Sequence, residues 1–142
     1  MIFEVLVKVV LTLSLMLSQQ MHIIKVELNM HEYKLTNQII EIAENHCRKA
    51  SAHKVKNVTI VVGDYSGVAA ESIDMYFDVI SEGTLCEGAK IKVERVRPKL
   101  LCPACGGLFT RQPMSFACPE CGEDGNPTEI GKEFYVKEIE VE

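Results

Sequence analysis

Four cysteines near the C-terminus have the type and spacing of metal ligands. Cys102 and Cys105 form one Cys-x-x-Cys pair, Cys118 and Cys121 form another, and twelve residues separate the pairs. A two-residue gap lets both thiols of a pair face one point from a tight turn, and two pairs supply the four soft ligands of a tetrahedral Zn²⁺ site. Because four thiolates leave no open coordination position, we expect this zinc to organise the chain and not to activate water.

The residues around the pairs favour zinc over two disulfides or a redox dithiol. Gly106 and Gly122 follow the second thiol of each pair, where the chain must turn without a Cβ clash. A redox dithiol usually occurs alone and in a βαβ context. Cys47 and Cys86 have no obvious partner, so we expect free thiols, a reducing compartment and a cytoplasmic protein. Cys47 is predicted to be a small, buried or half-buried helix residue.

Length and charge narrow the classes of function. The 142 residues suit one domain, or a small domain with a metal-stapled appendage. The formal net charge is −5, and a zinc tetrathiolate would make it more negative. Such a chain is poorly suited to binding phosphate backbones, so we expect no nucleic-acid partner. We find no Ser/His/Asp set, no Gly-rich phosphate loop and no open catalytic metal site, so we do not expect an enzyme.

Residues 1–29 differ in composition from the rest of the chain. The run from Val5 to Leu17 is apolar apart from Lys8 and a few hydroxyl residues, and it is too short for a typical membrane helix. It is also a poor secretory signal, because no basic residue precedes it and no Ala-x-Ala-like site follows. It is either an accessory hydrophobic segment or upstream sequence translated from an early start, with the working protein beginning at Met30. We favour the second interpretation and expect no membrane partner.

Hydrophobic periodicity after residue 30 predicts a small α+β domain. One amphipathic helix begins at His31 and is closed by residues 51–53, and a second covers residues 71–82. Alternating apolar residues predict three strands, over residues 58–63, 89–96 and 133–141. Leu35, Ile39, Ile42, Ala43 and His46 follow the helical spacing of one face of the first helix, and His46 could be core-facing or exposed.

The order of these elements makes the cysteine segment an insertion. It implies two helices packed on a small three-stranded sheet, with an inserted zinc-ribbon-like lobe. The expected domains are residues 30–98 with 132–142, which form an α/β domain, and residues 99–131, which bind zinc. The chain leaves the sheet to form the zinc lobe and returns to it as the final strand, so zinc would hold two parts of one chain together.

Six features occur in order between residue 30 and the C-terminus, without large gaps. They are Met30-His31-Glu32-Tyr33, Val61–Val68, Phe77–Thr84, Glu87-Gly88-Ala89, the two Cys-x-x-Cys pairs and Val136–Val141. Together they resemble the HypA/HybF family, the nickel metallochaperones of [NiFe]-hydrogenase maturation. The resemblance covers residues 30–142 and leaves residues 1–29 outside.

The resemblance implies nickel delivery without catalytic turnover. The family's proteins begin with Met-His-Glu, which corresponds here to Met30, His31 and Glu32, and Ni²⁺ favours square-planar nitrogen donors. The four nitrogen donors of the implied coordination square are the Met30 amine, the backbone nitrogen and imidazole of His31, and the Glu32 backbone nitrogen. Only a chain starting at Met30 has that amine.

The same resemblance implies two partners, a HypB-type nickel GTPase and the large subunit of a [NiFe]-hydrogenase. We expect a monomer or weak homodimer that carries Ni²⁺ and Zn²⁺. The competing prediction is a zinc-ribbon module that binds proteins or nucleic acid without nickel traffic.

Overall fold

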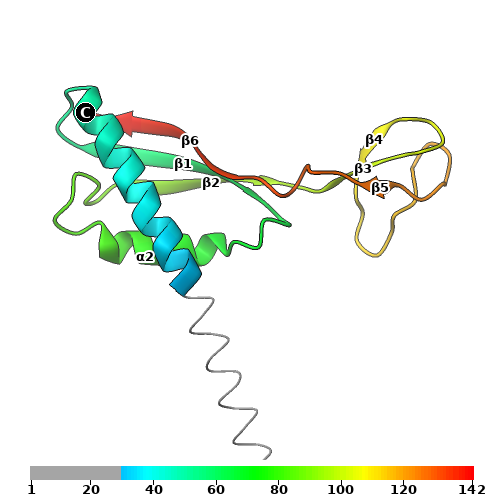
Figure 1. The fold of residues 1–142 in the computed structure, drawn as a ribbon, viewed down its shortest axis with the longest axis horizontal. Coiled ribbons are helices and arrows are strands. Elements are labelled where there is room, and N and C mark those ends of the chain that lie inside the picture. The colour runs from blue at the N-terminus through cyan, green and yellow to red at the C-terminus, as the bar shows by residue number, and fades with distance from the viewer. Residues whose placement is uncertain (1–29) are drawn as a thin grey trace, which may run out of the picture.

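The chain folds into two lobes that are joined by a narrow neck (Figure 1). This computed structural model describes residues 30–142, and the predictions made for residues 1–29 lie outside the described residues. The first lobe contains the helices and one three-stranded sheet, and the second contains a smaller three-stranded sheet and the four paired cysteines. None of the helices formed by residues 30–142 has the length and apolar character needed to span a bilayer.

A helical segment over residues 30–49 packs along the sheet of the first lobe. The predicted apolar face of this segment is partly wrong, because Ile42 is exposed, and His46, for which both positions were considered, is exposed as well. Thr36 and Ile40 are buried in addition to Ile39 and Ala43, and Cys47 is fully buried, which confirms its prediction. Small residues on this face allow the helix to approach the sheet closely. The buried Thr36 hydroxyl has a hydrogen-bond partner, because it donates to the Glu32 carbonyl at 2.7 Å. The buried face of the helical segment is therefore shifted around the helix axis relative to the face predicted from hydropathy.

Helix α2 (Ala70–Ile80) confirms the second predicted helix. Ile73 and Phe77 are fully buried, and Tyr76 and Ile80 are half-buried, so the expected face points to the core. The helix ends close to Gly83, whose φ of +74° lies in the left-handed region that favours glycine.

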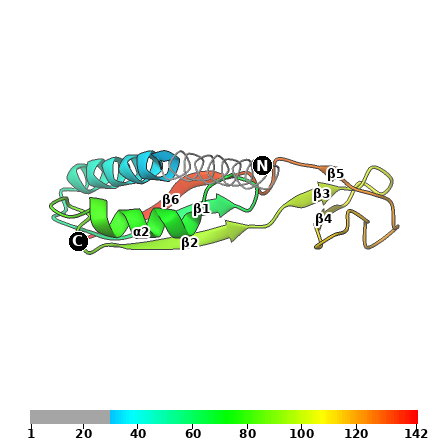
Figure 2. The same cartoon turned by 90° about the horizontal axis from the view of Figure 1, so that it is seen from below.

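The main sheet has the strand order β2-β1-β6. Its central strand is β1 (Val55–Gly63); β2 (Lys90–Val96) pairs with it in parallel and β6 (Phe134–Val141) pairs antiparallel. Val58, Ile60 and Val62 alternate along β1 and join residues of both helices in one core, so both helices cover the same face. Figure 2 shows β6 returning from the second lobe to lie beside β1, as the sequence predicted.

The second lobe is an insertion between β2 and β6. Its sheet has the order β4-β3-β5 with antiparallel pairing throughout. The strands are short: β3 (Lys99–Leu101), β4 (Leu108–Thr110) and β5 (Asn126–Pro127). Two helices, a small three-stranded sheet and a lobe with four clustered cysteines confirm the predicted α+β fold class.

Glycines allow the backbones at the neck to approach closely. The Gly63 amide donates to the Glu133 carbonyl and the Tyr65 amide donates to the Gly131 carbonyl, each at 2.7 Å. A Cβ on Gly63 would lie 2.1 Å from the Gly131 oxygen, and one on Gly131 would lie 2.8 Å from Pro98 Cα. The end of β1 is therefore hydrogen-bonded directly to the segment that returns from the second lobe.

Candidate metal centres

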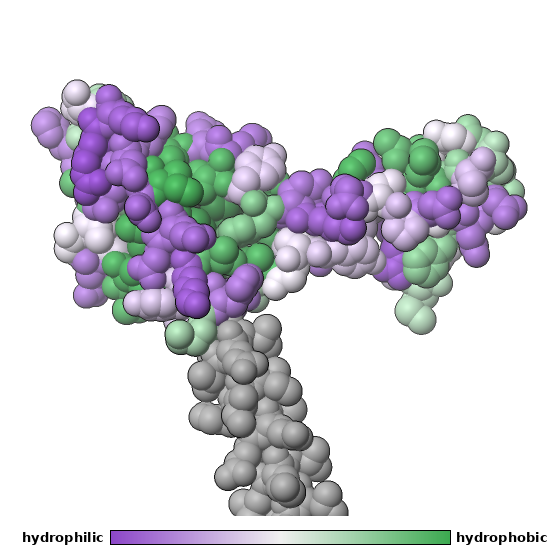
Figure 3. All heavy atoms as spheres, in the orientation of Figure 1, coloured by the Kyte–Doolittle hydropathy of each residue, from purple (hydrophilic) through white to green (hydrophobic). Residues whose placement is uncertain are grey.

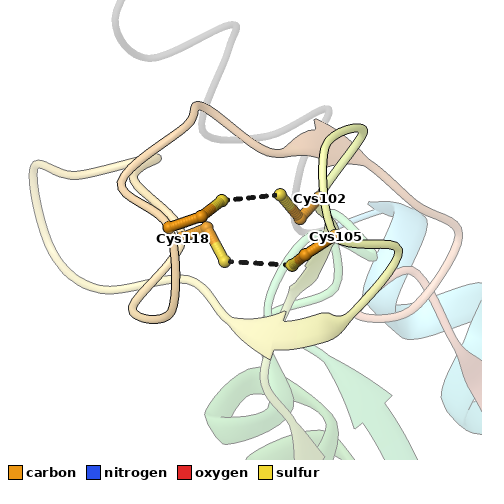
Figure 4. Close-up of side chains that lie close together, drawn as sticks. Cys102, Cys105 and Cys118 are labelled. Atoms are coloured by element: carbon orange, nitrogen blue, oxygen red, sulfur yellow. Dashed lines mark hydrogen bonds between the residues drawn. The ribbon is translucent and has the colours of Figure 1, made fainter.

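The four paired cysteines converge on one point in the second lobe. Their Sγ atoms all lie within 4.8 Å of one another. Cys102 Sγ lies 3.4 Å from Cys121 Sγ, and Cys105 Sγ lies 3.7 Å from Cys118 Sγ. Figure 4 shows the Cys105 and Cys118 thiols pointing toward one another, with Cys102 beside them. A tetrahedral ion with Zn–S bonds of about 2.3 Å has S–S edges of about 3.8 Å, so this donor set fits Zn²⁺.

The two Cys-x-x-Cys pairs share one local fold. In each pair the glycine after the second thiol donates its amide to the carbonyl of the first cysteine: Gly106 to Cys102 and Gly122 to Cys118, both at 2.9 Å. The φ angles of Gly106 and Gly122 are +72° and +78°. These values confirm that a residue with a Cβ would be strained at either position. Two equivalent turns therefore present their thiols to a common centre.

Hydrogen bonds distribute protons unevenly among the four sulfurs. The pKa of Cys102 is lowered to about 7, mainly because its sulfur accepts a hydrogen bond from the Cys105 amide. Burial acts in the opposite direction, and a hydrogen bond from the Cys121 thiol lowers the pKa further. The Glu123 amide favours the Cys121 thiolate, but hydrogen bonding to Cys102 and burial outweigh it and raise the pKa of Cys121 to about 12. A divalent cation bound at the centre replaces these shared protons, so metal uptake by this group must release protons.

The predicted nickel residues lie at the start of the described helical segment. Met30 and His31 are exposed, whereas Glu32 is only 3% exposed. His31 therefore faces solvent beside an anchored neighbour. The structure does not bring His31 and the four cysteines together, because they belong to different lobes (Figure 1).

Glu32 anchors the helical segment to α2. Its carboxylate Oε1 accepts a hydrogen bond from the Ala69 amide at 3.3 Å. Ala69 is the N-cap residue of α2 and supplies no side-chain cap of its own, so Glu32 acts as the cap from another helix. A carboxylate there also interacts favourably with the positive end of the α2 dipole. Sequence reasoning missed this contact because 37 residues separate its partners.

A second group that sequence reasoning missed lies at the neck. Arg111 of the second lobe donates to the Tyr65 hydroxyl of the first lobe. The Arg111 guanidinium carbon lies 5.9 Å from the ring centroid of Tyr65 and 4.5 Å from that of Phe116. The contact with Tyr65 links the two lobes, and the contact with Phe116 holds the guanidinium within the second lobe. No sequence pattern signals a contact between residues 46 positions apart.

Comparisons with known proteins agree on one family. A family model described as "Hydrogenase/urease nickel incorporation, metallochaperone, hypA" matches residues 30–141. The hydrogenase maturation factor HypA of Caldanaerobacter subterraneus subsp. tengcongensis is 39% identical over 114 residues, which cover 80% of this chain and 100% of that relative. The protein of the same name from Geobacter sp. strain M21 is 41% identical over 113 residues, with coverages of 80% and 100%.

Solved structures show the same fold. The solution structure of the Ni metallochaperone HypA from Helicobacter pylori has a TM-score of 0.52 at 24% identity and covers 78% of this chain and 96% of that one. Another HypA solution structure has a TM-score of 0.59 at 24% identity, with coverages of 79% and 96%. At this identity the likeness supports the architecture alone.

Proposed function

The chain belongs to the HypA family, and from this membership we propose that it binds Ni²⁺ and delivers it to the large subunit of a [NiFe]-hydrogenase. Its proposed partner is a HypB-type nickel GTPase, and its proposed compartment is the cytoplasm. The activity is transfer of a metal cargo, without chemical turnover. The observation that carries the proposal is that the family match begins at Met30, where Met30-His31-Glu32 presents an exposed imidazole.

His31 is the proposed side-chain ligand for nickel. The remaining donors are the Met30 amine, in a chain that starts there, and the backbone nitrogens of His31 and Glu32. In an α-helix these nitrogens carry protons and point along the helix axis. Coordination through them therefore requires the turn at Met30–Glu32 to unwind around the ion. The buried Glu32 carboxylate would keep the segment attached to α2 while its backbone rearranges.

The second proposed metal is a structural Zn²⁺ held by four cysteines of the second lobe. The sulfur–sulfur distances and the matching turns support this assignment. When bound, zinc cross-links the two Cys-x-x-Cys turns of the insertion and performs no chemistry on the cargo. The ligands are Cys102, Cys105, Cys118 and Cys121.

The decisive experiment is calorimetric titration of Ni²⁺ into the zinc-loaded chain that starts at Met30. His31→Ala should abolish nickel binding and leave the zinc content unchanged, because the imidazole is the only side-chain donor in the proposed square. His46→Ala is the matched control, since His46 is also exposed on the same helix. If His31→Ala binds nickel as tightly as the parent, the proposed site is wrong.

Two further measurements test the donors. Nickel must displace protons from nitrogen ligands, so affinity should fall as pH decreases from about 7.5 to about 6 while zinc is largely retained. The chain that starts at Met1 should bind Ni²⁺ more weakly than the chain that starts at Met30. If neither chain binds nickel, a zinc-ribbon interaction module becomes the better description.

A further inference from the structure

A pocket of about 310 Å³ lies at the neck between the two lobes. Its walls include Asp64-Tyr65 after β1, Arg97-Pro98 at the end of β2, and Arg111-Gln112 after β4. We propose that this interlobe pocket binds a carboxylate, carried either by an acidic peptide side chain or by a free dicarboxylic acid. The proposal goes beyond nickel delivery and uses none of the proposed metal ligands.

Backbone hydrogen bonds hold the walls of the interlobe pocket in place. The Tyr65 amide donates to the Gly131 carbonyl at 2.7 Å, and the Arg111 amide donates to the Pro98 carbonyl at 3.1 Å. Pro98 is buried, and Gly131 packs directly against it. Three segments from both lobes are therefore joined before any ligand arrives, which lowers the entropy lost on binding.

Two guanidinium groups in this pocket have unused hydrogen-bond donors. Arg111 has five N–H donors, and the described residues supply one acceptor to it, the Tyr65 hydroxyl. Its Nε is buried and finds no hydrogen-bond partner within residues 30–142, so the donors that a ligand can reach are those of the terminal guanidinium nitrogens. Arg97 is exposed and makes neither an ion pair nor a side-chain hydrogen bond with the part of the chain that the structure describes. An anion would supply the missing hydrogen-bond acceptors to these two guanidinium groups.

Asp64 determines which anion the pocket favours. Its carboxylate also lines the pocket, and Arg95 lies 3.8 Å from it, so its charge is only partly compensated. A phosphate dianion would place two negative charges on one group beside Asp64, whereas each carboxylate group of a ligand carries one, so Asp64 repels the phosphate more strongly. A planar carboxylate also matches the fork of a guanidinium, because two parallel N–H···O bonds can form.

The size and walls of the pocket limit what carries the carboxylate. A volume of about 310 Å³ is at the small end of ligand sites, which span roughly 300–1,000 Å³. The exposed Tyr65 ring and Pro113 offer apolar surface to a short aliphatic stem, whereas the face of the neck seen in Figure 3 is mostly hydrophilic. A glutamate side chain and a five-carbon diacid have this combination of stem and charge.

The test is an NMR titration of the full, zinc-loaded, ¹⁵N-labelled chain. The probes are glutarate and the blocked peptide acetyl-Gly-Glu-Glu-Glu-Gly-amide, and the reference compounds are neutral glutaramide and inorganic phosphate. We expect saturable shifts of the Tyr65 and Gln112 amides with the two carboxylate probes. Arg97→Gln should weaken binding about tenfold, as expected for one charge-assisted contact. Arg48→Gln, which removes an exposed arginine from the helical segment, is the matched control.

The outcomes separate the sources of the carboxylate. Tighter binding of the peptide identifies a segment of another protein as the ligand, and tighter binding of glutarate identifies a small acid; either result supports the proposal. Three results would overturn it: no saturable shift with either probe, phosphate binding as tightly as the carboxylates, or Arg97→Gln binding as tightly as Arg48→Gln.

Discussion

Replacing Glu32 should destabilise the first lobe through a helix to which Glu32 does not belong. Its carboxylate is buried and caps α2 by accepting the Ala69 amide. The variants Glu32→Ala and Glu32→Gln separate loss of the acceptor from loss of the charge. We expect both to weaken α2 at its N-terminus, where Ala69 offers no side-chain substitute.

The magnitude follows from the geometry of this contact. A hydrogen bond to a charged acceptor contributes about 1.5–3 kcal/mol, but the N···O distance of 3.3 Å is long, so about 1–2 kcal/mol is appropriate here. Glu32→Ala also leaves a small cavity and an unpaired amide, and should cost about 2–3 kcal/mol. Glu32→Gln keeps the volume and an acceptor oxygen and loses mainly the interaction with the helix dipole, about 1 kcal/mol.

Urea unfolding of the zinc-saturated chain, followed by circular dichroism, measures these free energies. Amide hydrogen exchange at Ala69 provides a local readout, because the unpaired amide should exchange faster in Glu32→Ala. Glu41→Ala is the matched control, since Glu41 is exposed on the same helix and its loss should change stability by no more than about 0.5 kcal/mol. If Glu32→Ala were as stable as Glu41→Ala with unchanged exchange at Ala69, the cap would contribute nothing.

Three further changes test other parts of the structure. Cys118→Ala should release about one zinc ion per chain and loosen the second lobe, measured by metal analysis and NMR; stoichiometric disulfides in the parent would contradict this. Gly63→Ala should cost about 2–4 kcal/mol in urea unfolding, because its Cβ would lie 2.1 Å from the Gly131 oxygen; unchanged stability would show that the neck yields easily. Burial, reinforced by Glu44 and Cys47, raises the pKa of Cys86 from 9.0 to about 11. The folded chain thus holds this proton more tightly than the unfolded chain, and the resulting stability is present below pH 9.0 and lost as pH rises toward about 11. Cys86→Ala should reduce that loss, and an identical pH dependence in the variant would refute the assignment.

Local patterns predicted most of the elements because each depends on neighbouring residues. The alternation of Val58, Ile60 and Val62 predicted a strand with one buried face, and β1 has that face in the core. The buried face of the first helix was predicted partly wrongly, because Thr36 is buried whereas the more apolar Ile42 is exposed. That choice depends on how closely the helix can approach the sheet, which periodicity does not encode.

The cysteine cluster could be predicted from the amino-acid sequence alone. Each Cys-x-x-Cys pair forms its own turn, and glycine at 106 and 122 makes the left-handed backbone accessible, so spacing and residue type are sufficient. Two contacts could not be predicted in this way: Glu32 caps α2, and Arg111 reaches Tyr65 beside a basic pocket between the lobes. These contacts join residues 37 and 46 positions apart. They depend on how packed elements are placed in space, and no local preference of the chain specifies that placement.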